Sequence, residues 1–133
     1  MRYLFITALL VFCSCLMAQD QAGNPPDEII KYYFVELKTN VDRAELAKHK
    51  IDSIQRAHFI YMAKMAENGQ LMLGGPFKGG GGIFILKAQN MEEAEQLVAN
   101  DPTVYSGRLI PEIRIWYTKK GAFTQELKQQ EEH

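Results

Sequence analysis

Residues 70–102 read QLMLGGPFKGGGGIFILKAQNMEEAEQLVANDP, and the patterns in this stretch set the order of the structural elements. The stretch opens with a short apolar segment, Gln70–Phe77, whose last residues are Gly-Gly-Pro-Phe. Four glycines at 79–82 follow, and a second apolar segment, Ile83–Lys87, comes directly after them. Two apolar runs joined by a glycine-rich turn are typical of a β-hairpin, so we expect two antiparallel strands here.

The second half of the stretch has the pattern of a capped helix. Asn90 is a residue type that caps helix N-termini, and Glu93 stands where the carboxylate of a capping box is expected. We expect this helix to end near Ala99, and a short helical turn to be opened by Asp101-Pro102 and closed by Gly107. The apolar face of the helix is formed by Met91, Ala94, Leu97 and Val98.

Three further elements flank this stretch. Lys31–Lys38 (KYYFVELK) is rich in aromatic and β-branched residues and predicts a strand. A helix is expected from about Arg43 to Asn68, with a break near Lys48 and a stop at Asn68-Gly69. Leu109–Lys119 predicts the last strand.

The expected order is therefore β-α-β-β-α-β, which is the ferredoxin-like arrangement of an α+β protein. In this fold both helices cover one face of an antiparallel sheet. The strands are nevertheless apolar on both faces, because Phe84 and Leu86 alternate with Ile83 and Ile85. A second copy of the same sheet is the simplest cover for the uncovered face, so we expect a homodimer.

The ends of the chain carry different patterns. Arg2, the apolar run Tyr3–Phe12 and the Ala18-Gln19 junction are typical of a secretory signal peptide, and the run is too short to span a membrane. Residues 124–133 are charged and poor in apolar side chains. The expected segments are a signal peptide (1–18), a flexible leader (19–28), one domain (29–123) and a charged tail (124–133).

Both cysteines, Cys13 and Cys15, fall inside the expected signal peptide. Cleavage after Ala18 would leave neither a disulfide nor a cysteine nucleophile in the mature protein. We expect an exported, periplasmic protein. The alternative is a lipoprotein, in which Cys15 becomes a lipidated N-terminus that anchors the protein to a membrane.

Composition excludes several classes of protein. The chain is 47% hydrophobic and 23% charged, as globular domains are, and its net charge of −1 gives no electrostatic basis for nucleic-acid binding. The four glycines lack the Lys-Ser/Thr of a phosphate-binding loop, and no HExxH, cysteine cluster or G-x-S-x-G occurs. We therefore expect neither a cofactor nor a metal.

His58 is the first candidate for chemistry, because it places an imidazole on an apolar helical face. Imidazole suits proton transfer near neutral pH, although the pattern alone favours a core histidine with satisfied nitrogens. Asp101 is the second candidate, either as a helix N-cap or as a carboxylate that orients His58. His49 is nine residues before His58 and faces the opposite side of a continuous helix, which makes a metal pair a weak interpretation.

Polar residues interrupt the apolar strands and indicate a polar-lined cleft on the uncovered sheet face, although strand edges explain some of them. The candidates for substrate binding on this face are Phe34, Glu36, Arg114 and Trp116.

Three segments together resemble the YCII-related (YciI-like) family: QRAHFIYMAKMAENGQLMLGGPF (55–77), GGGGIFIL (79–86) and MEEAEQLVANDPTVYSGRLIPEIRIWY (91–117). The resemblance covers roughly Tyr32 to Phe123. It implies a dimeric α/β barrel with a site built on a paired His and Asp, which here are His58 and Asp101. We expect these two side chains to share a hydrogen bond beside a pocket on the uncovered sheet face.

The expected function is that of a small dimeric acid–base enzyme, of lyase or isomerase type, that acts on a small cyclic or aromatic organic substrate. In this hypothesis His58 moves the proton and Asp101 orients the imidazole of His58. One alternative is a non-catalytic module, ligand-binding or stress-associated, that uses the same cleft. Another is a purely structural interaction domain, in which no polar pocket residue matters.

Overall fold

The structure is a computed structural model that describes residues 28–123 of the 133-residue chain. The expected signal peptide with both cysteines, all but the last residue of the expected leader, and the expected charged tail lie outside the described residues. No helix within residues 28–123 is both long enough and apolar enough to cross a membrane.

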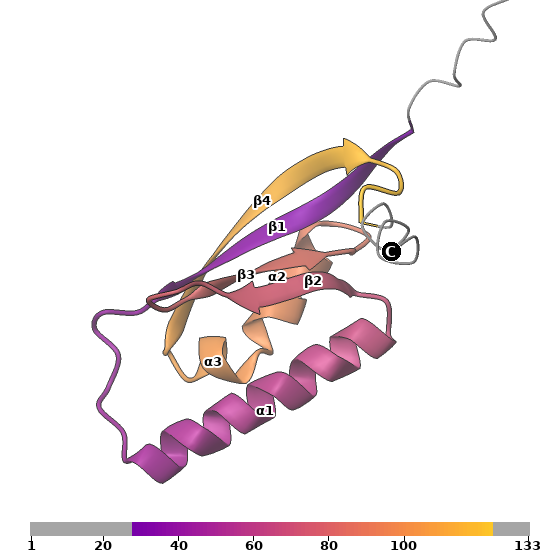
Figure 1. The fold of residues 1–133 in the computed structure, drawn as a ribbon. Coiled ribbons are helices and arrows are strands. Elements are labelled where there is room, and N and C mark those ends of the chain that lie inside the picture. The colour runs from indigo at the N-terminus through magenta and orange to yellow at the C-terminus, as the bar shows by residue number, and fades with distance from the viewer. Residues whose placement is uncertain (1–27, 124–133) are drawn as a thin grey trace, which may run out of the picture.

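Four antiparallel strands form one sheet in the order β2-β3-β1-β4, and three helices lie on one of its faces (Figure 1). The elements follow one another as β-α-β-β-α-α-β, so the ferredoxin-like α+β arrangement is confirmed, with the expected helical turn as α3. In chain order the elements are β1 (Ile29–Thr39), α1 (Lys48–Glu67), β2 (Leu71–Pro76), β3 (Gly82–Leu86), α2 (Met91–Ala99), α3 (Pro102–Tyr105) and β4 (Leu109–Lys119).

The start of α1 differs from the prediction. The helix begins at Lys48 rather than near Arg43, and Asn40 explains the difference. Its side-chain oxygen accepts a hydrogen bond from the Asp42 backbone N–H at 3.0 Å, and its amide nitrogen donates to the Gly107 carbonyl at 2.8 Å. The loop is therefore fixed by local and long-range hydrogen bonds that compete with a helical conformation.

The predicted capping box at the start of α2 is present. The Asn90 side chain accepts from the Glu93 backbone N–H at 2.8 Å, and the Glu93 carboxylate accepts from the Gln89 backbone N–H at 2.7 Å. The first bond satisfies a backbone donor of the first helical turn, and the second holds the residue before the N-cap, one position earlier than in the usual capping box. They fix where α2 begins, and hence where the chain turns back towards the sheet.

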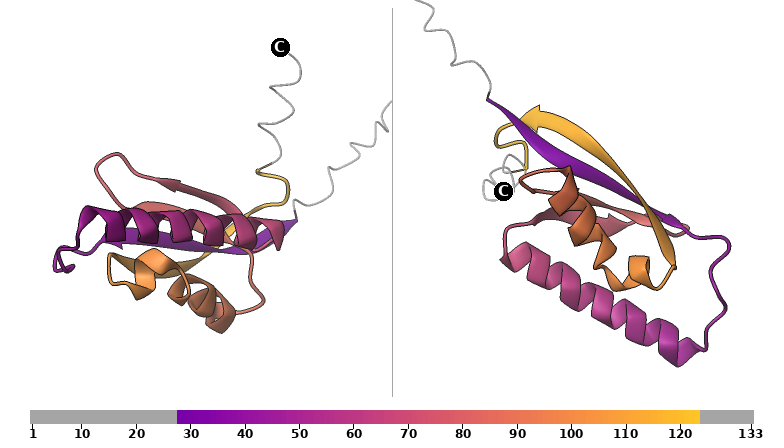
Figure 2. Two further views of the ribbon diagram at one scale, coloured as in Figure 1. Left: turned by 90° about the horizontal axis from the view of Figure 1, so that it is seen from below. Right: turned by 180° about the vertical axis from the view of Figure 1, so that it is seen from behind.

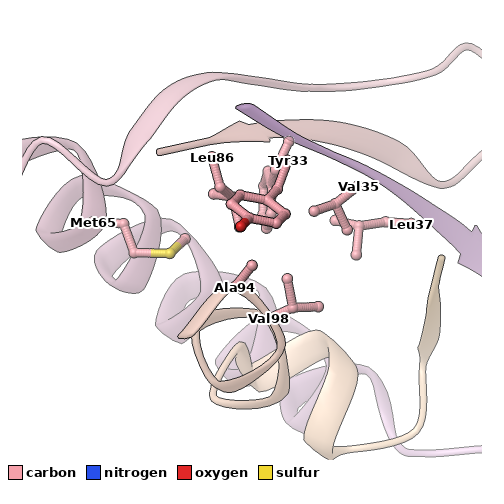
Figure 3. Close-up of a cluster of buried hydrophobic side chains, with 8 residues drawn as sticks. Tyr33, Val35, Leu37, Met65, Leu86, Ala94 and Val98 are labelled. Atoms are coloured by element: carbon pink, nitrogen blue, oxygen red, sulfur yellow. The ribbon is translucent and has the colours of Figure 1, made fainter. Parts of the chain in front are cut away.

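The core lies between the sheet and the helices. Alternate residues of β1 point into it, and β3 supplies Phe84 opposite Val35 and Leu86 opposite Tyr33. Each buried aliphatic side chain contributes about 1.5–3 kcal/mol relative to exposure. In Figure 3 the labelled members of this cluster are Tyr33, Val35, Leu37, Met65, Leu86, Ala94 and Val98.

The opposite face of the sheet is covered by no helix of the described part, as Figure 2 shows from two further sides. The strands present apolar residues there too, and Leu73 and Trp116 are 49% and 36% exposed. Phe34 pairs with Ile85 on one side and with Arg114 on the other, which places all three on this face. The prediction that the strands are apolar on both faces is therefore confirmed.

Candidate active site between helix α1 and the sheet

His58 and Asp101 are in direct contact. The imidazole Nδ1 lies 2.9 Å from Oδ1 and 2.8 Å from Oδ2 of the carboxylate. Both side chains are buried, with His58 8% exposed and Asp101 fully enclosed. The predicted hydrogen bond between these residues is therefore present, whereas a role of the pair in catalysis stays a prediction.

Asp101 is fixed by more than the histidine. It is the N-cap of α3, and its Oδ1 accepts from the Thr103 backbone N–H at 2.8 Å and from the Thr103 hydroxyl at 2.6 Å. Pro102 at the first helical position needs no such partner, because it has no N–H. Both proposed roles of Asp101, capping and orienting, are thus compatible, because one carboxylate accepts several hydrogen bonds.

The other nitrogen of His58 opens to a pocket. Nε2 makes no hydrogen bond within residues 28–123. Every buried side-chain nitrogen or oxygen of these residues has a hydrogen-bond partner, so Nε2 is not a buried atom. Because His58 also lines a pocket, Nε2 is the ring atom left for a ligand. Of the two neutral tautomers of the ring, a carboxylate at Nδ1 favours the one with the proton on Nδ1 and a free lone pair on Nε2, which is the form of histidine that takes up a proton.

Aromatic rings set the plane of the imidazole. The Phe84 ring is stacked at 6.0 Å between centroids and 18° between planes, and the Phe59 ring lies at 5.5 Å. Phe84 comes from β3 and Phe59 from α1, so the ring of His58 is held between a strand and its own helix. This contact and the Asp101 hydrogen bond together leave the ring little freedom to rotate.

The pocket has a volume of about 400 Å³ and lies between α1, the β2–β3 end of the sheet and the loops on either side. This volume is in the range of small-ligand sites. Much of the wall is apolar. Its polar side chains are those of His58, Gln55, Thr103, Arg43 and Arg108. The apolar wall comes from Leu37, Ile51, Phe59, Met62, Ile83, Phe84 and Leu109.

Glycines make room for this pocket at two places. A Cβ on Gly74 would lie 3.0 Å from Met62 Cε and 3.0 Å from Phe84 Cδ1, so α1 and β2 approach closely there. Gly81 has φ +74, and a Cβ on it would lie 2.4 Å from the Leu37 carbonyl oxygen. The glycine-rich segment is therefore a tight hairpin turn at the pocket, as predicted. Gly81 is required by its close approach to the Leu37 backbone, whereas Gly74 leaves space for the side chains of Met62 and Phe84.

The predicted location of the pocket is wrong. The pocket beside His58 is on the helix side of the sheet, because the helical stripe that carries His58 faces the core. Phe34, Arg114 and Trp116 lie across the sheet from it, where they line a separate hollow of about 510 Å³ with Leu73, Ile83, Ile85, Ile115 and Phe123. The structure thus brings His58 and Asp101 together but does not bring the four predicted binding residues to them.

The charged residues of the uncovered face pair with one another. Arg114 lies 3.6 Å from the Glu36 carboxylate and 3.8 Å from that of Glu112, and its guanidinium is 5.1 Å from the centroid of the Phe34 ring. A hydrogen bond from Lys38, reinforced by its positive charge, lowers the pKa of Glu112. These cross-strand pairs account for the polar residues that interrupt the strand pattern.

Two pocket residues were missed at the sequence level. Arg43 falls in the segment expected to be helical, and Arg108 follows the turn closed by Gly107; both line the pocket. The distance between Arg43 and Arg108 in the sequence does not indicate that they meet, because the loop after β1 brings them together only in the folded protein. Within residues 28–123 no group of three or more His, Cys, Asp or Glu could hold a metal ion, and His49 is exposed.

The Asp101 carboxylate also acts electrostatically on Tyr61 of α1. Its hydroxyl donates to the Leu97 carbonyl at 2.9 Å and so ties α1 to α2. Burial, together with the negative charge of Asp101, raises the pKa of the Tyr61 hydroxyl above its ordinary value.

Comparison with known proteins identifies the family of the chain. No curated protein matches the chain. Among solved structures, it is similar to 5-chloro-2-hydroxyhydroquinone dehydrochlorinase from Burkholderia phenoliruptrix AC1100 in complex with 2,5-dihydroxybenzoquinone. The identity is 21% and the TM-score 0.49, over 64% of this chain and 90% of that chain. The family model of the YCII-related domain matches residues 32–119, which is well over half of the chain and reaches the end of β4. The chain therefore belongs to the YCII-related family.

Proposed function

We propose that this protein is a small acid–base enzyme of lyase or isomerase type, in which His58 transfers a proton on a small cyclic organic substrate. The observation that carries the proposal is the 2.8 Å contact between His58 Nδ1 and a fully buried carboxylate, with Nε2 open to a pocket. This arrangement supports a general base, because the carboxylate favours the tautomer with a free Nε2 and stabilises the imidazolium that forms.

The proposed step begins with Nε2 taking a proton from a carbon of the substrate. The electron pair of the broken C–H bond then forms a double bond to the neighbouring carbon. In a lyase a leaving group departs from that neighbour with its own bonding pair, and the imidazolium returns its proton to the leaving group or to solvent. In an isomerase the neighbouring carbon already carries a double bond, whose π pair shifts to the next carbon as the new double bond forms, and that next carbon takes the proton from the imidazolium.

The pocket wall supports a small, ring-shaped substrate. The side chains of Met62, Ile83 and Leu109 offer apolar contact, and a volume of about 400 Å³ leaves space for a single ring with short substituents. Gly74 and Gly81 add no side chain to this space. The pocket thus supports a substrate class rather than one compound.

We also propose that two copies pair through the uncovered sheet faces. Exposed apolar residues there, among them Leu73 and Trp116, support this arrangement, because contiguous exposed apolar surface is otherwise unfavourable in water. Such pairing would leave the His58 pocket accessible, because that pocket lies on the other side of the sheet.

A ligand-binding function without catalysis is the second candidate. The hollow on the uncovered face favours it, because Phe34 and Arg114 meet there and the Trp116 and Phe123 rings lie 6.0 Å apart. In this case the ligand would be held by aromatic contact and not by the His–Asp pair.

Deuterium exchange distinguishes the two functions. Small cyclic enols and hydroxyaromatic compounds would be incubated with the protein in D2O, and deuterium incorporation at carbon would be followed by NMR. An enzyme should exchange at least one compound faster than buffer, and His58→Gln should abolish the difference while His49→Gln retains it. If no compound exchanges and Trp116→Ala weakens the binding of the same compounds, the second candidate is correct.

A further inference from the structure

Two arginines that are far apart in the sequence line the His58 pocket together. Arg43 belongs to the loop after β1, and Arg108 directly precedes β4. Both also line the adjoining hollow of the β1–α1 loop. The sequence separates them by more than half the length of the domain, so their common position is a property of the tertiary structure.

The backbone between these arginines is firmly held. The Asn40 backbone N–H donates to the Arg108 carbonyl at 3.0 Å, and the Arg108 N–H donates to the Thr103 carbonyl at 3.0 Å. The Asn40 side chain reaches the Gly107 carbonyl, and its backbone carbonyl accepts from the Arg43 N–H at 3.4 Å. One asparagine therefore connects the backbone of both arginines, and Thr103, which donates to Asp101, connects Arg108 to the His58–Asp101 pair.

The positive charge of the pocket wall is not neutralised. Within residues 28–123 no Asp or Glu lines the pocket, and neither Arg43 nor Arg108 takes part in an ion pair. Glu45 lines the adjoining hollow but pairs with neither arginine. The nearby Asp101 is fully enclosed and already accepts from His58 and Thr103. Two guanidinium groups therefore remain for an anion from solution.

We propose that the substrate of the His58 pocket is an organic acid, whose carboxylate is bound by Arg43 and Arg108 while its ring lies against the apolar wall beside His58. The inference rests on the proposed function for the identity of the site, and it adds the chemical class of the substrate. Guanidinium groups bind carboxylates with paired, charge-assisted hydrogen bonds. The apolar residues Met62, Phe84 and Leu109 favour a carboxylate attached to a ring over a fully polar anion such as free phosphate.

Calorimetry with three probes tests this assignment: benzoate, its neutral analogue benzamide, and inorganic phosphate. Benzoate should bind at least about tenfold more tightly than either of the others, because only benzoate satisfies both the guanidinium pair and the apolar wall. Arg43→Gln and Arg108→Gln should each weaken benzoate binding by about fivefold or more and leave benzamide unchanged. Arg56→Gln is the matched control, since Arg56 is an exposed arginine of α1 that does not line the pocket.

Further variants separate this inference from the proposed function. Arg108→Lys keeps the positive charge and should retain part of the affinity, which shows that a loss in Arg108→Gln does not come from misfolding. His58→Gln should abolish proton exchange yet retain benzoate binding within about twofold, because the histidine does not bind the carboxylate. Equal affinities for benzoate and benzamide, tighter binding of phosphate, or equal losses in Arg56→Gln would each overturn the assignment, whatever His58 does.

Discussion

His58 Nδ1 lies 2.8 Å from one carboxylate oxygen of Asp101 and 2.9 Å from the other, across 43 residues of sequence. The histidine belongs to α1, and the aspartate is the N-cap of α3. One buried carboxylate therefore joins two helices, caps the second of them and orients an imidazole. The structural role and the chemical role have to be separated by substitutions that retain one and remove the other.

Asp101→Asn should reverse the tautomer of His58. The new amide keeps an oxygen for Thr103 but places an N–H donor opposite Nδ1, so the ring proton moves to Nε2. Heteronuclear NMR of the ring nitrogens at alkaline pH should find the proton on Nδ1 in the wild type and on Nε2 in the variant. Proton-exchange activity should fall by roughly 10²-fold or more. The same tautomer in both proteins would show that Asp101 is only a helix cap.

Gly74→Ala should disturb the pocket, whereas Gly75→Ala should not. The added methyl group at 74 would lie 3.0 Å from Met62 Cε and Phe84 Cδ1, while at 75 nothing lies within 4 Å. We expect Gly74→Ala to lower the free energy of unfolding by about 1 kcal/mol, because Phe84 is buried and only the end of Met62 is free to move. Urea unfolding of the two variants checks this, and equal stabilities would contradict the close approach of α1 to β2.

Tyr61 should make stability fall at alkaline pH. Burial, and then the charge of Asp101, raises the pKa of Tyr61 in the folded protein above its value of 10.0 in an unfolded chain. Its contribution to stability is therefore complete below about pH 10 and is lost as the pH rises through the higher folded pKa. Across this interval Tyr61→Phe should lose less stability than the wild type in urea unfolding at stepwise pH. Parallel curves for the two proteins would argue against the raised pKa.

Trp116→Glu should weaken self-association if the uncovered sheet faces form the dimer. The side chain is partly exposed among apolar neighbours, so a carboxylate there would be desolvated on pairing at a cost of several kcal/mol. Sedimentation at micromolar concentration should find a dimer for the wild type and a shift towards monomer for the variant. Ile60→Glu is a suitable control, because Ile60 is 65% exposed on α1 and away from this face. A wild-type monomer with an intact fold would contradict the arrangement.

The N-terminal segment should be removed on export. Arg2, the apolar run to Phe12 and the Ala18-Gln19 junction motivate the prediction. Intact-mass analysis of protein exported by a bacterial host should give a chain that begins at Gln19. A lipid on Cys15 would favour the anchored alternative, and a mass that still includes the first residues would count against both.

Local patterns were sufficient to predict most elements. The alternation of apolar residues predicted the strands, and Leu109–Lys119 was predicted with the bounds that β4 has in the structure. The Asn90 capping box and the Asp101-Pro102 turn were likewise recognisable, because a cap and its partner lie within a few residues of each other. The start of α1 was not predictable in this way, because Asn40 holds the preceding loop through Gly107 and Arg108.

The sequence by itself determined the order of elements, the two apolar faces of the sheet and, through the resemblance to the family, the partnership of His58 and Asp101. Only the tertiary structure decided that their pocket lies on the helix side of the sheet, away from Phe34 and Arg114, and that Arg43 and Arg108 share it. The physical reason is the range of the interactions. Periodicity and caps depend on neighbours a few residues apart, whereas a pocket is formed by side chains that meet only after the strands have paired and α1 has packed on them.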